Sequence, residues 1–280
     1  NFCDMFLIMG KKHRKRSVNT IVSEIEMLHK EYGINFFSFM DDQLTLNKAH
    51  IIDLCNEILK RKLKIMFNTP NGLWINSLRE EVVAKMAEAG LVYAGLAVEH
   101  GDDYIRNKVI GKALDRKKIF EVAGLLKKYK VMTGGYFIMG FPEDTNETMQ
   151  NTYDMIDELQ LDTSGVHPAI PFPGTALFKQ VIKDKLLIHD WNLDDLWKTP
   201  ITPTQNEFVV KPYNMSVDDL HKWREKFDKM VIKYWKTSNS EESLSIGKNR
   251  IVNKAGTVQR YKVIKNKVFI YKSVNKKLPA

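Results

Sequence analysis

The sequence has 280 residues, of which 44% are hydrophobic and 28% are charged, a composition typical of a globular protein. Its longest apolar runs are far shorter than the roughly 20 residues that a membrane-spanning helix requires. Its two cysteines are too few for a disulfide framework. The composition therefore argues against a membrane-spanning or disulfide-rich secreted protein and indicates a cytoplasmic one.

The net charge of +9 is concentrated near the end of the chain. Ten lysines and arginines and no acidic residue lie between Ser243 and Ala280, so residues 1–242 are close to neutral. A uniformly basic surface would suggest a nucleic-acid-binding protein, whereas a basic tail is more often a solvated segment or an edge strand kept soluble by lysine. Binding of nucleic acid or another anionic surface by the tail stays open as the less favoured interpretation.

Apolar strands and amphipathic helices are expected to alternate through the first 187 residues. The first helix is expected to begin after the N-cap Ser17 and to end near Gly33, and the second is expected to begin at Asn47. Further helices are expected at 78–89, about 114–129 and 147–159, the first of them closed by Gly90. The expected strands are 34–40, 64–68, 91–98, 131–139 and 166–170.

This alternation predicts a parallel sheet with right-handed crossovers, either open or closed into a barrel. Polar and turn residues follow each expected strand, namely Asp41, Asp42, Asn71, Glu99, Gly140 and Pro173. The carboxyl ends of parallel strands share one edge, where α/β folds bind their ligands. The pattern therefore predicts an α/β enzyme with a site at that edge.

The regular alternation stops after Leu187. Residues 188–212 are expected to form a connecting loop, and a helix capped by Ser216 is expected over 217–235. Residues 257–272 alternate enough for a hairpin that turns near Lys265 and Asn266. The expected organisation is therefore a core over 1–187 and a small helical and basic C-terminal appendage over 188–280.

Several motifs in order carry a family resemblance. The sequence contains NFC, MGKKHRKRS, FMDDQLTLN, VEHG, FIMGFPEDTNET and PFPGT. Together they resemble the radical S-adenosylmethionine (radical SAM) superfamily, and they are similar to its branch often joined to an N-terminal cobalamin-binding domain. The resemblance covers 1–187 and implies a partial (β/α)6 TIM-like barrel.

The opening residues resemble the end of the family's CxxxCxΦC iron–sulfur loop, with Phe2 as the aromatic Φ and Cys3 as the last cysteine. The resemblance implies that three thiolates hold a [4Fe–4S] cluster, and by its spacing the other two would precede Asn1, as would the first barrel strand. The chain is therefore expected to be an N-terminally incomplete fragment that is inactive alone. The alternative is a degenerate member that has lost its cluster.

The resemblance also assigns cofactor contacts. It implies that Asp41 and Asp42 contact the ammonium group of S-adenosylmethionine, and that Glu99 lies near the ribose or the methionine end. Lys112 is a candidate partner for the cofactor carboxylate. All four side chains are of types that also occur as turn, capping or surface residues, so these structural roles stay open for them.

At the fifth family strand, the resemblance implies that Ile138 and Gly140 lie against adenine, where glycine permits close backbone approach. Cys55 is expected in the core, because it lies on the apolar face of its helix. His13, His100 and His167 lack the spacing of a metal site, and of the three only His167 stays open as a residue that faces the cavity. Catalytic residues stay unassigned.

The function implied is an enzyme core that uses a [4Fe–4S] cluster to cleave S-adenosylmethionine to a 5′-deoxyadenosyl radical, for methyl transfer or another C–H functionalisation. The implied partners are a small or lipid-like substrate, an electron donor such as flavodoxin or ferredoxin, and cobalamin through a missing N-terminal domain. One alternative is a tRNA-modifying methylthiotransferase. The other is a non-catalytic scaffold that binds an anionic partner through its basic tail.

Overall fold

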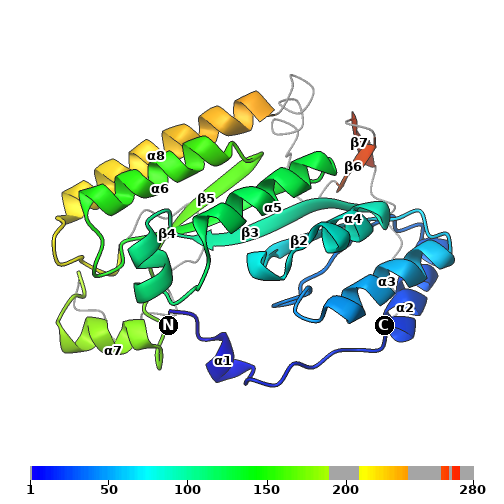
Figure 1. Ribbon diagram of the computed structural model, residues 1–280, viewed down its shortest axis with the longest axis horizontal. Coiled ribbons are helices and arrows are strands. Elements are labelled where there is room, and N and C mark those ends of the chain that lie inside the picture. Colours follow the sequence, from blue (N-terminus) through cyan, green and yellow to red (C-terminus); the bar gives the residue numbers. More distant parts are fainter. Residues whose placement is uncertain (1, 189–207, 239–259, 265–266, 272–280) are drawn as a thin grey trace, which may run out of the picture.

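The structure is a computed structural model that describes residues 2–188, 208–238, 260–264 and 267–271. Five parallel strands form one sheet in chain order, so each strand pairs with the next one along the sequence. They are β1 (Phe36–Ser38), β2 (Met66–Leu73), β3 (Leu91–Glu99), β4 (Met132–Met139) and β5 (Thr163–Pro168). Figure 1 shows the strands side by side with helices alongside them. The expected partial barrel of parallel strands is confirmed.

Helices precede, connect and follow the strands. The longer ones up to β5 are α2 (Val18–Tyr32), α3 (Lys48–Lys60), α4 (Glu80–Glu88), α5 (Arg116–Lys128) and α6 (Asn146–Leu159). The expected caps are confirmed, since the Ser17 and Asn47 side chains accept the N–H groups of Thr20 and His50. Gly33 closes α2 with a left-handed φ of 68°.

The two faces of the sheet differ in what covers them. Because side chains alternate along a strand, Phe67, Leu96 and Phe137 point to one face, where they are at most 1% exposed and join helical side chains in the main core. The opposite face carries partly exposed side chains, among them Asn68, Tyr93, Tyr136 and His167. The helices therefore cover one face of the sheet and leave the other more open.

The structure corrects the bounds of three strands. The strand expected at 34–40 is shorter, since β1 covers only Phe36–Ser38. The strand expected at 64–68 continues as β2 through Pro70 and Gly72 to Leu73, because a register shift beside β3 takes these turn-type residues into the strand. The strand expected at 166–170 is β5, which begins at Thr163 and ends at Pro168. Backbone pairing with β4 sets both ends of β5, whereas the sequence prediction followed the apolar residues.

Four short elements were not expected from the sequence. They are α1 (Met5–Ile8), the 3-10 turn η1 (Ile75–Ser77), the π-helical turn η2 (Ile105–Val109) and α7 (Ala176–Lys183). Short helices carry little periodicity, so the sequence pattern gives only a weak signal for them. Three of them, η1, η2 and α7, border the carboxyl edge of the sheet because they follow β2, β3 and β5.

The C-terminal helix α8 (Val217–Ser238) packs on the core. Phe227 and Met230 are buried in the main hydrophobic cluster, and Arg224 Nη1 donates to the backbone oxygen of Val166 in β5 at 2.7 Å. The expected hairpin is confirmed as antiparallel β6 (Arg260–Ile264) and β7 (Lys267–Tyr271), while its turn and most of the expected loop at 188–212 lie outside the described residues. The division into core and appendage at Leu187 stays a prediction.

Among the described residues, no helix is long and apolar enough to cross a membrane.

Candidate functional site

Two of the sequence-predicted residues meet at the carboxyl end of β3. Lys112 Nζ lies 2.6 Å from Glu99 Oε1, and Glu99 is only 8% exposed. Glu99 also has a φ of 71°, in the left-handed region that side-chain-bearing residues rarely adopt and that clusters at functional sites. A carboxylate and an ammonium side by side are suited to a ligand that carries both charges, such as an amino-acid group.

Ile138 and Gly140 occupy the end of the neighbouring strand β4. Gly140 has a φ of 86°, which favours glycine, and its N–H donates to Asp144 Oδ2 at 2.8 Å. Ile138 is partly buried and pairs across the sheet with His167 on β5. Burial, and then the charge of Arg224, lower the pKa of His167, so the neutral ring is favoured there.

Asp41 and Asp42 lie apart from this pair of strand ends. Both are exposed in the loop between β1 and α3, and the Asn71 amide donates to Met40 O at 2.9 Å, which holds this loop against β2. The strand β1 is two positions from β3 in the sheet, a separation of about 10 Å. A single ligand would have to span β2 to contact Glu99 together with these aspartates.

Cys3 lies near the same edge of the sheet. It is exposed, and the ring of the preceding Phe2 packs edge-on against Phe141, with 6.0 Å between ring centroids. Cys55 is buried in the core as expected, and burial raises the pKa of its thiol to about 12. Among the described residues, no group of three His, Cys, Asp or Glu could hold a metal. The cysteines of this chain therefore do not fit a three-thiolate cluster site.

The different surroundings of the two cysteines predict different reactivity. Under native conditions near pH 8, iodoacetamide is expected to alkylate Cys3 and to leave Cys55 unmodified, because only an accessible thiolate reacts. Intact-mass spectrometry should show one adduct, and two after denaturation in urea. Alkylation of Cys55 in the folded protein at a rate comparable with Cys3 would contradict its burial.

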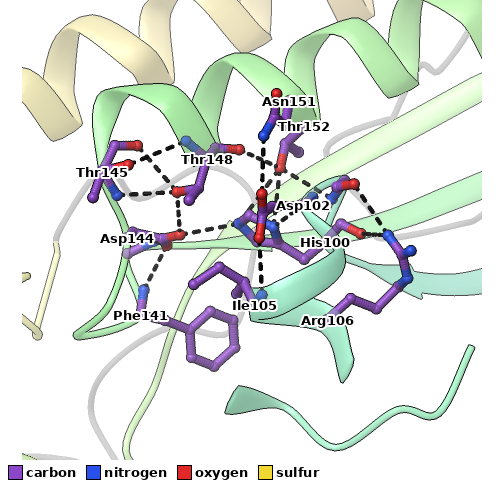
Figure 2. Close-up of polar contacts among 12 residues, drawn as sticks. His100, Asp102, Ile105, Arg106, Phe141, Asp144, Thr145, Thr148, Asn151 and Thr152 are labelled. Atoms are coloured by element: carbon purple, nitrogen blue, oxygen red, sulfur yellow. Dashed lines mark hydrogen bonds and ion pairs between the residues drawn. The ribbon is translucent and has the colours of Figure 1, made fainter. Parts of the chain in front are cut away.

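A buried polar network, which the sequence did not reveal, connects the ends of β3 and β4 (Figure 2). The side chains of His100 and Asp144 are both 0% exposed, and His100 Nε2 lies 3.1 Å from Asp144 Oδ1. Asp144 Oδ2 accepts the backbone N–H groups of Gly140 and Phe141, each at 2.8 Å, and the Thr148 hydroxyl donates to Oδ1 at 2.9 Å. One carboxylate therefore fixes the turn that follows β4.

The hydrogen-bond partners of His100 determine its tautomer. The backbone N–H of Asp102 donates to Nδ1 at 3.0 Å, so Nδ1 is the unprotonated nitrogen of a neutral ring. The ring proton then lies on Nε2 and points to Asp144. The Thr152 hydroxyl, which accepts the Gly101 N–H at 3.1 Å, attaches the same segment to α6.

Arg106 holds the segment after β3 through its backbone oxygens. Its side chain is completely buried, and its Nη1 donates to the backbone oxygens of His100 at 2.8 Å and Gly101 at 3.1 Å. Its Nε donates to Leu114 O at 2.9 Å, and it also forms an ion pair with Asp103. A buried arginine thus holds both the segment after Glu99 and the loop that carries Lys112.

Asp102 starts the π-helical turn that contains Arg106. Its Oδ1 accepts the N–H groups of Tyr104 and Ile105, and the Asn151 amide donates to Oδ2 at 2.9 Å. Burial acts to raise the pKa of Asp102, but the hydrogen bonds from Ile105 and Asn151 bring it below its ordinary value. Asp102 is therefore a charged capping residue in the network.

Comparison with known proteins identifies the fold. The model of the radical SAM superfamily matches residues 1–156, more than half of the chain. The chain belongs to the radical SAM superfamily. Membership implies S-adenosylmethionine and a [4Fe–4S] cluster as cofactors, and it confirms the resemblance seen in the motifs.

Two relatives and one solved structure illustrate the similarity. An uncharacterized methyltransferase of Pyrococcus horikoshii is 32% identical over 187 residues, which cover 67% of this chain and 40% of the relative. The cytidylyl-2-hydroxyethylphosphonate methyltransferase of Streptomyces wedmorensis is 28% identical over 188 residues, covering 65% and 35%. The radical S-adenosylmethionine methyltransferase TsrM of Kitasatospora setae, solved with cobalamin and a [4Fe-4S] cluster, matches 76% of this chain and 41% of its own at 18% identity, with a TM-score of 0.55.

The likeness to TsrM supports the fold. This chain spans about a third to two-fifths of the length of the two curated relatives.

Proposed function

We propose that this chain is the S-adenosylmethionine-binding core of a radical SAM methyltransferase that acts on a small molecule. The observation that carries the proposal is the joint placement of Glu99, Lys112 and the Gly140 turn at the adjoining ends of β3 and β4. Both curated relatives described above are named methyltransferases, which favours methyl transfer over the methylthiotransferase alternative.

In this proposal the residues at the strand ends bind different parts of S-adenosylmethionine. Lys112 pairs with its carboxylate group, because an ammonium complements that charge, and the neighbouring Glu99 lies near the ribose or the methionine end. Ile138 supplies an apolar contact for adenine, and the Gly140 backbone allows close approach. When bound, S-adenosylmethionine supplies the methyl group or the deoxyadenosyl group for the reaction.

Asp41 and Asp42 are proposed to contact the ammonium group from the β1 side, and Cys3 is proposed as one cluster ligand. Cys3 is suited to this role because it is exposed beside the turn after β4, through the packing of Phe2 on Phe141. A three-thiolate cluster needs two more thiolates than Cys3 supplies.

The remaining partners are proposed from family membership. They are an electron donor such as flavodoxin or ferredoxin and a cobalamin bound by another domain, in a cytoplasmic protein. TsrM was solved with cobalamin bound, which is the support for a cobalamin partner. The proposed organisation keeps a core over 1–187 and a C-terminal appendage over 188–280, with binding of nucleic acid by its basic tail as the less favoured role.

Radical initiation tests the proposal. The full-length gene product that contains this sequence would be reconstituted anaerobically with iron and sulfide, then given S-adenosylmethionine and a reductant, and 5′-deoxyadenosine and methylated products would be quantified. The wild-type protein is expected to form product, and Cys3→Ala is expected to abolish it because a cluster ligand is lost.

Cys55→Ala is the matched control, because this cysteine is buried in the core and should leave product formation intact. A wild-type protein that binds iron but neither cleaves S-adenosylmethionine nor transfers its methyl group would contradict the proposed function. Equal activity of wild type and Cys3→Ala would contradict the role of Cys3.

A further inference from the structure

The end of β3 is held rigidly by its own buried contacts. Directly after Glu99, the backbone oxygen of His100 accepts from Arg106, and the His100 ring accepts the N–H of Asp102 at Nδ1. Arg106 also holds Leu114 O, close in sequence to Lys112. The position of the Glu99 and Lys112 pair is therefore tied to the position of His100.

The end of β4 is held by Asp144. Its Oδ2 accepts two consecutive backbone N–H groups, those of Gly140 and Phe141, and Thr148 donates to Oδ1 from the first turn of α6. The turn proposed to lie against adenine thus has its backbone oriented by this carboxylate. A carboxylate that accepts backbone N–H groups makes strong, directional contacts.

The His100–Asp144 hydrogen bond joins these two assemblies, and the His100 ring also packs edge-on against Phe141, with 6.5 Å between ring centroids. Figure 2 shows the His100 ring and the Asp144 carboxylate pointing toward each other between β3 and the start of α6. Since both side chains are 0% exposed, solvent does not compete for this hydrogen bond and the surroundings strengthen it. Backbone pairing of β3 with β4 ends at Glu99 and Phe137, so beyond that pair the His100–Asp144 contact helps to hold the two segments that follow the strands.

We propose that His100 and Asp144 are positioning residues, which set the separation of the β3 and β4 ends so that S-adenosylmethionine meets Glu99 and the Gly140 turn in one preformed geometry. This inference rests on the proposed function, and it adds a role for two buried residues that do not themselves touch the cofactor. Groups that bind a ligand are effective only when supporting contacts hold them in place.

Three variants change the contact in known ways. Asparagine at position 100 reaches only the place of Nδ1, so His100→Asn loses the donor to Asp144, whereas glutamine reaches the place of Nε2, so His100→Gln keeps it. Asp144→Asn turns an amide N–H₂ toward either His100 or the backbone N–H groups, which are all donors. His100→Asn therefore breaks the contact and His100→Gln preserves it, while Asp144→Asn sets donor against donor either at His100 or at the Gly140 turn.

Asp162→Asn is the matched control. Asp162 Oδ2 accepts the backbone N–H of Thr133 at 2.8 Å, near the beginning of β4. The variant therefore weakens a contact between a carboxylate and the backbone of the same strand, but at the amino end of β4, away from the site. A purely structural role of His100 and Asp144 would make all of these variants alike in their effect on cofactor binding.

The test is the dissociation constant of S-adenosylmethionine, measured by equilibrium dialysis with the full-length, cluster-loaded protein, together with the thermal midpoint of each variant. His100→Asn and Asp144→Asn are expected to weaken binding about tenfold, because misplaced binding groups lose much of their effect. His100→Gln and Asp162→Asn are expected to stay within about twofold of wild type.

Folded His100→Asn protein with wild-type affinity would overturn this inference and leave the proposed function intact. Equal weakening by Asp162→Asn and His100→Asn would also overturn it, since the effect would then follow general destabilisation. A wild-type protein that binds no S-adenosylmethionine would overturn the proposed function and this inference together. Where Asp144→Asn does not fold, the comparison of His100→Asn with His100→Gln decides.

Discussion

Replacing Asp144 by alanine is expected to lower the free energy of unfolding by about 3–5 kcal/mol. The carboxylate is completely buried and accepts hydrogen bonds from the N–H groups of Gly140 and Phe141 and from the Thr148 hydroxyl, with His100 Nε2 at 3.1 Å. Alanine would leave these donors buried without an acceptor, and burial prevents water from replacing it.

Urea denaturation followed by circular dichroism measures the effect. Asp154→Ala is the control, because Asp154 lies in α6, is exposed and accepts from the Gln150 amide. Its loss is expected to cost less than about 1 kcal/mol. A loss below about 1 kcal/mol for Asp144→Ala would show that the turn after β4 is held by other contacts.

Local patterns in the sequence predicted the elements of the fold well. The caps at Ser17 and Asn47 and the glycine stop at Gly33 depend on neighbouring residues only, so they could be read directly. Parallel topology then placed Glu99 and Gly140 on a common edge before any contact was known. The shared edge could be predicted because it follows from order along the chain, whereas the predicted ends of β2 and β5 were wrong.

The contact between His100 and Asp144 could not be predicted in that way. Each residue has an adequate local explanation, His100 as the residue after a strand and Asp144 as part of the turn before α6. Their pairing depends on how β3, β4 and α6 pack, which local periodicity does not encode. His100 lies in the motif VEHG and Asp144 in GFPEDTNET. A search for polar residues that follow neighbouring strands would have suggested that these two side chains pair.

The role of α8 shows the same limit. The cap residue Ser216 predicted a helix over 217–235, and the helix is present as Val217–Ser238. The contact from Arg224 to Val166 O and the burial of Phe227 place it against β5 and the main core, which only the folded structure reveals. An amphipathic face indicates that a partner exists without identifying it.

Gly101→Ala is expected to destabilise the protein by about 3 kcal/mol, through overpacking of backbone against backbone. A Cβ atom at Gly101 would lie 2.3 Å from Thr152 Cα and 2.5 Å from Asn151 O, both in the backbone of α6. These atoms belong to a packed helix and cannot rotate away as the end of a flexible side chain could. The only relief is to move α6 from the end of β3, which would break the hydrogen bond from Gly101 N–H to Thr152.

Gly124→Ala is the matched control, because Gly124 lies in α5 and a Cβ there meets no atom within 4 Å. Alanine is a better helix former than glycine, so this variant is expected to stabilise the protein by about 0.5–1 kcal/mol. The same substitution is thus expected to lower the stability at Gly101 and to raise it at Gly124, and thermal unfolding can measure both changes. If Gly101→Ala were neutral, α6 could shift at little cost, and the fixed spacing that the His100 and Asp144 contact requires would not exist.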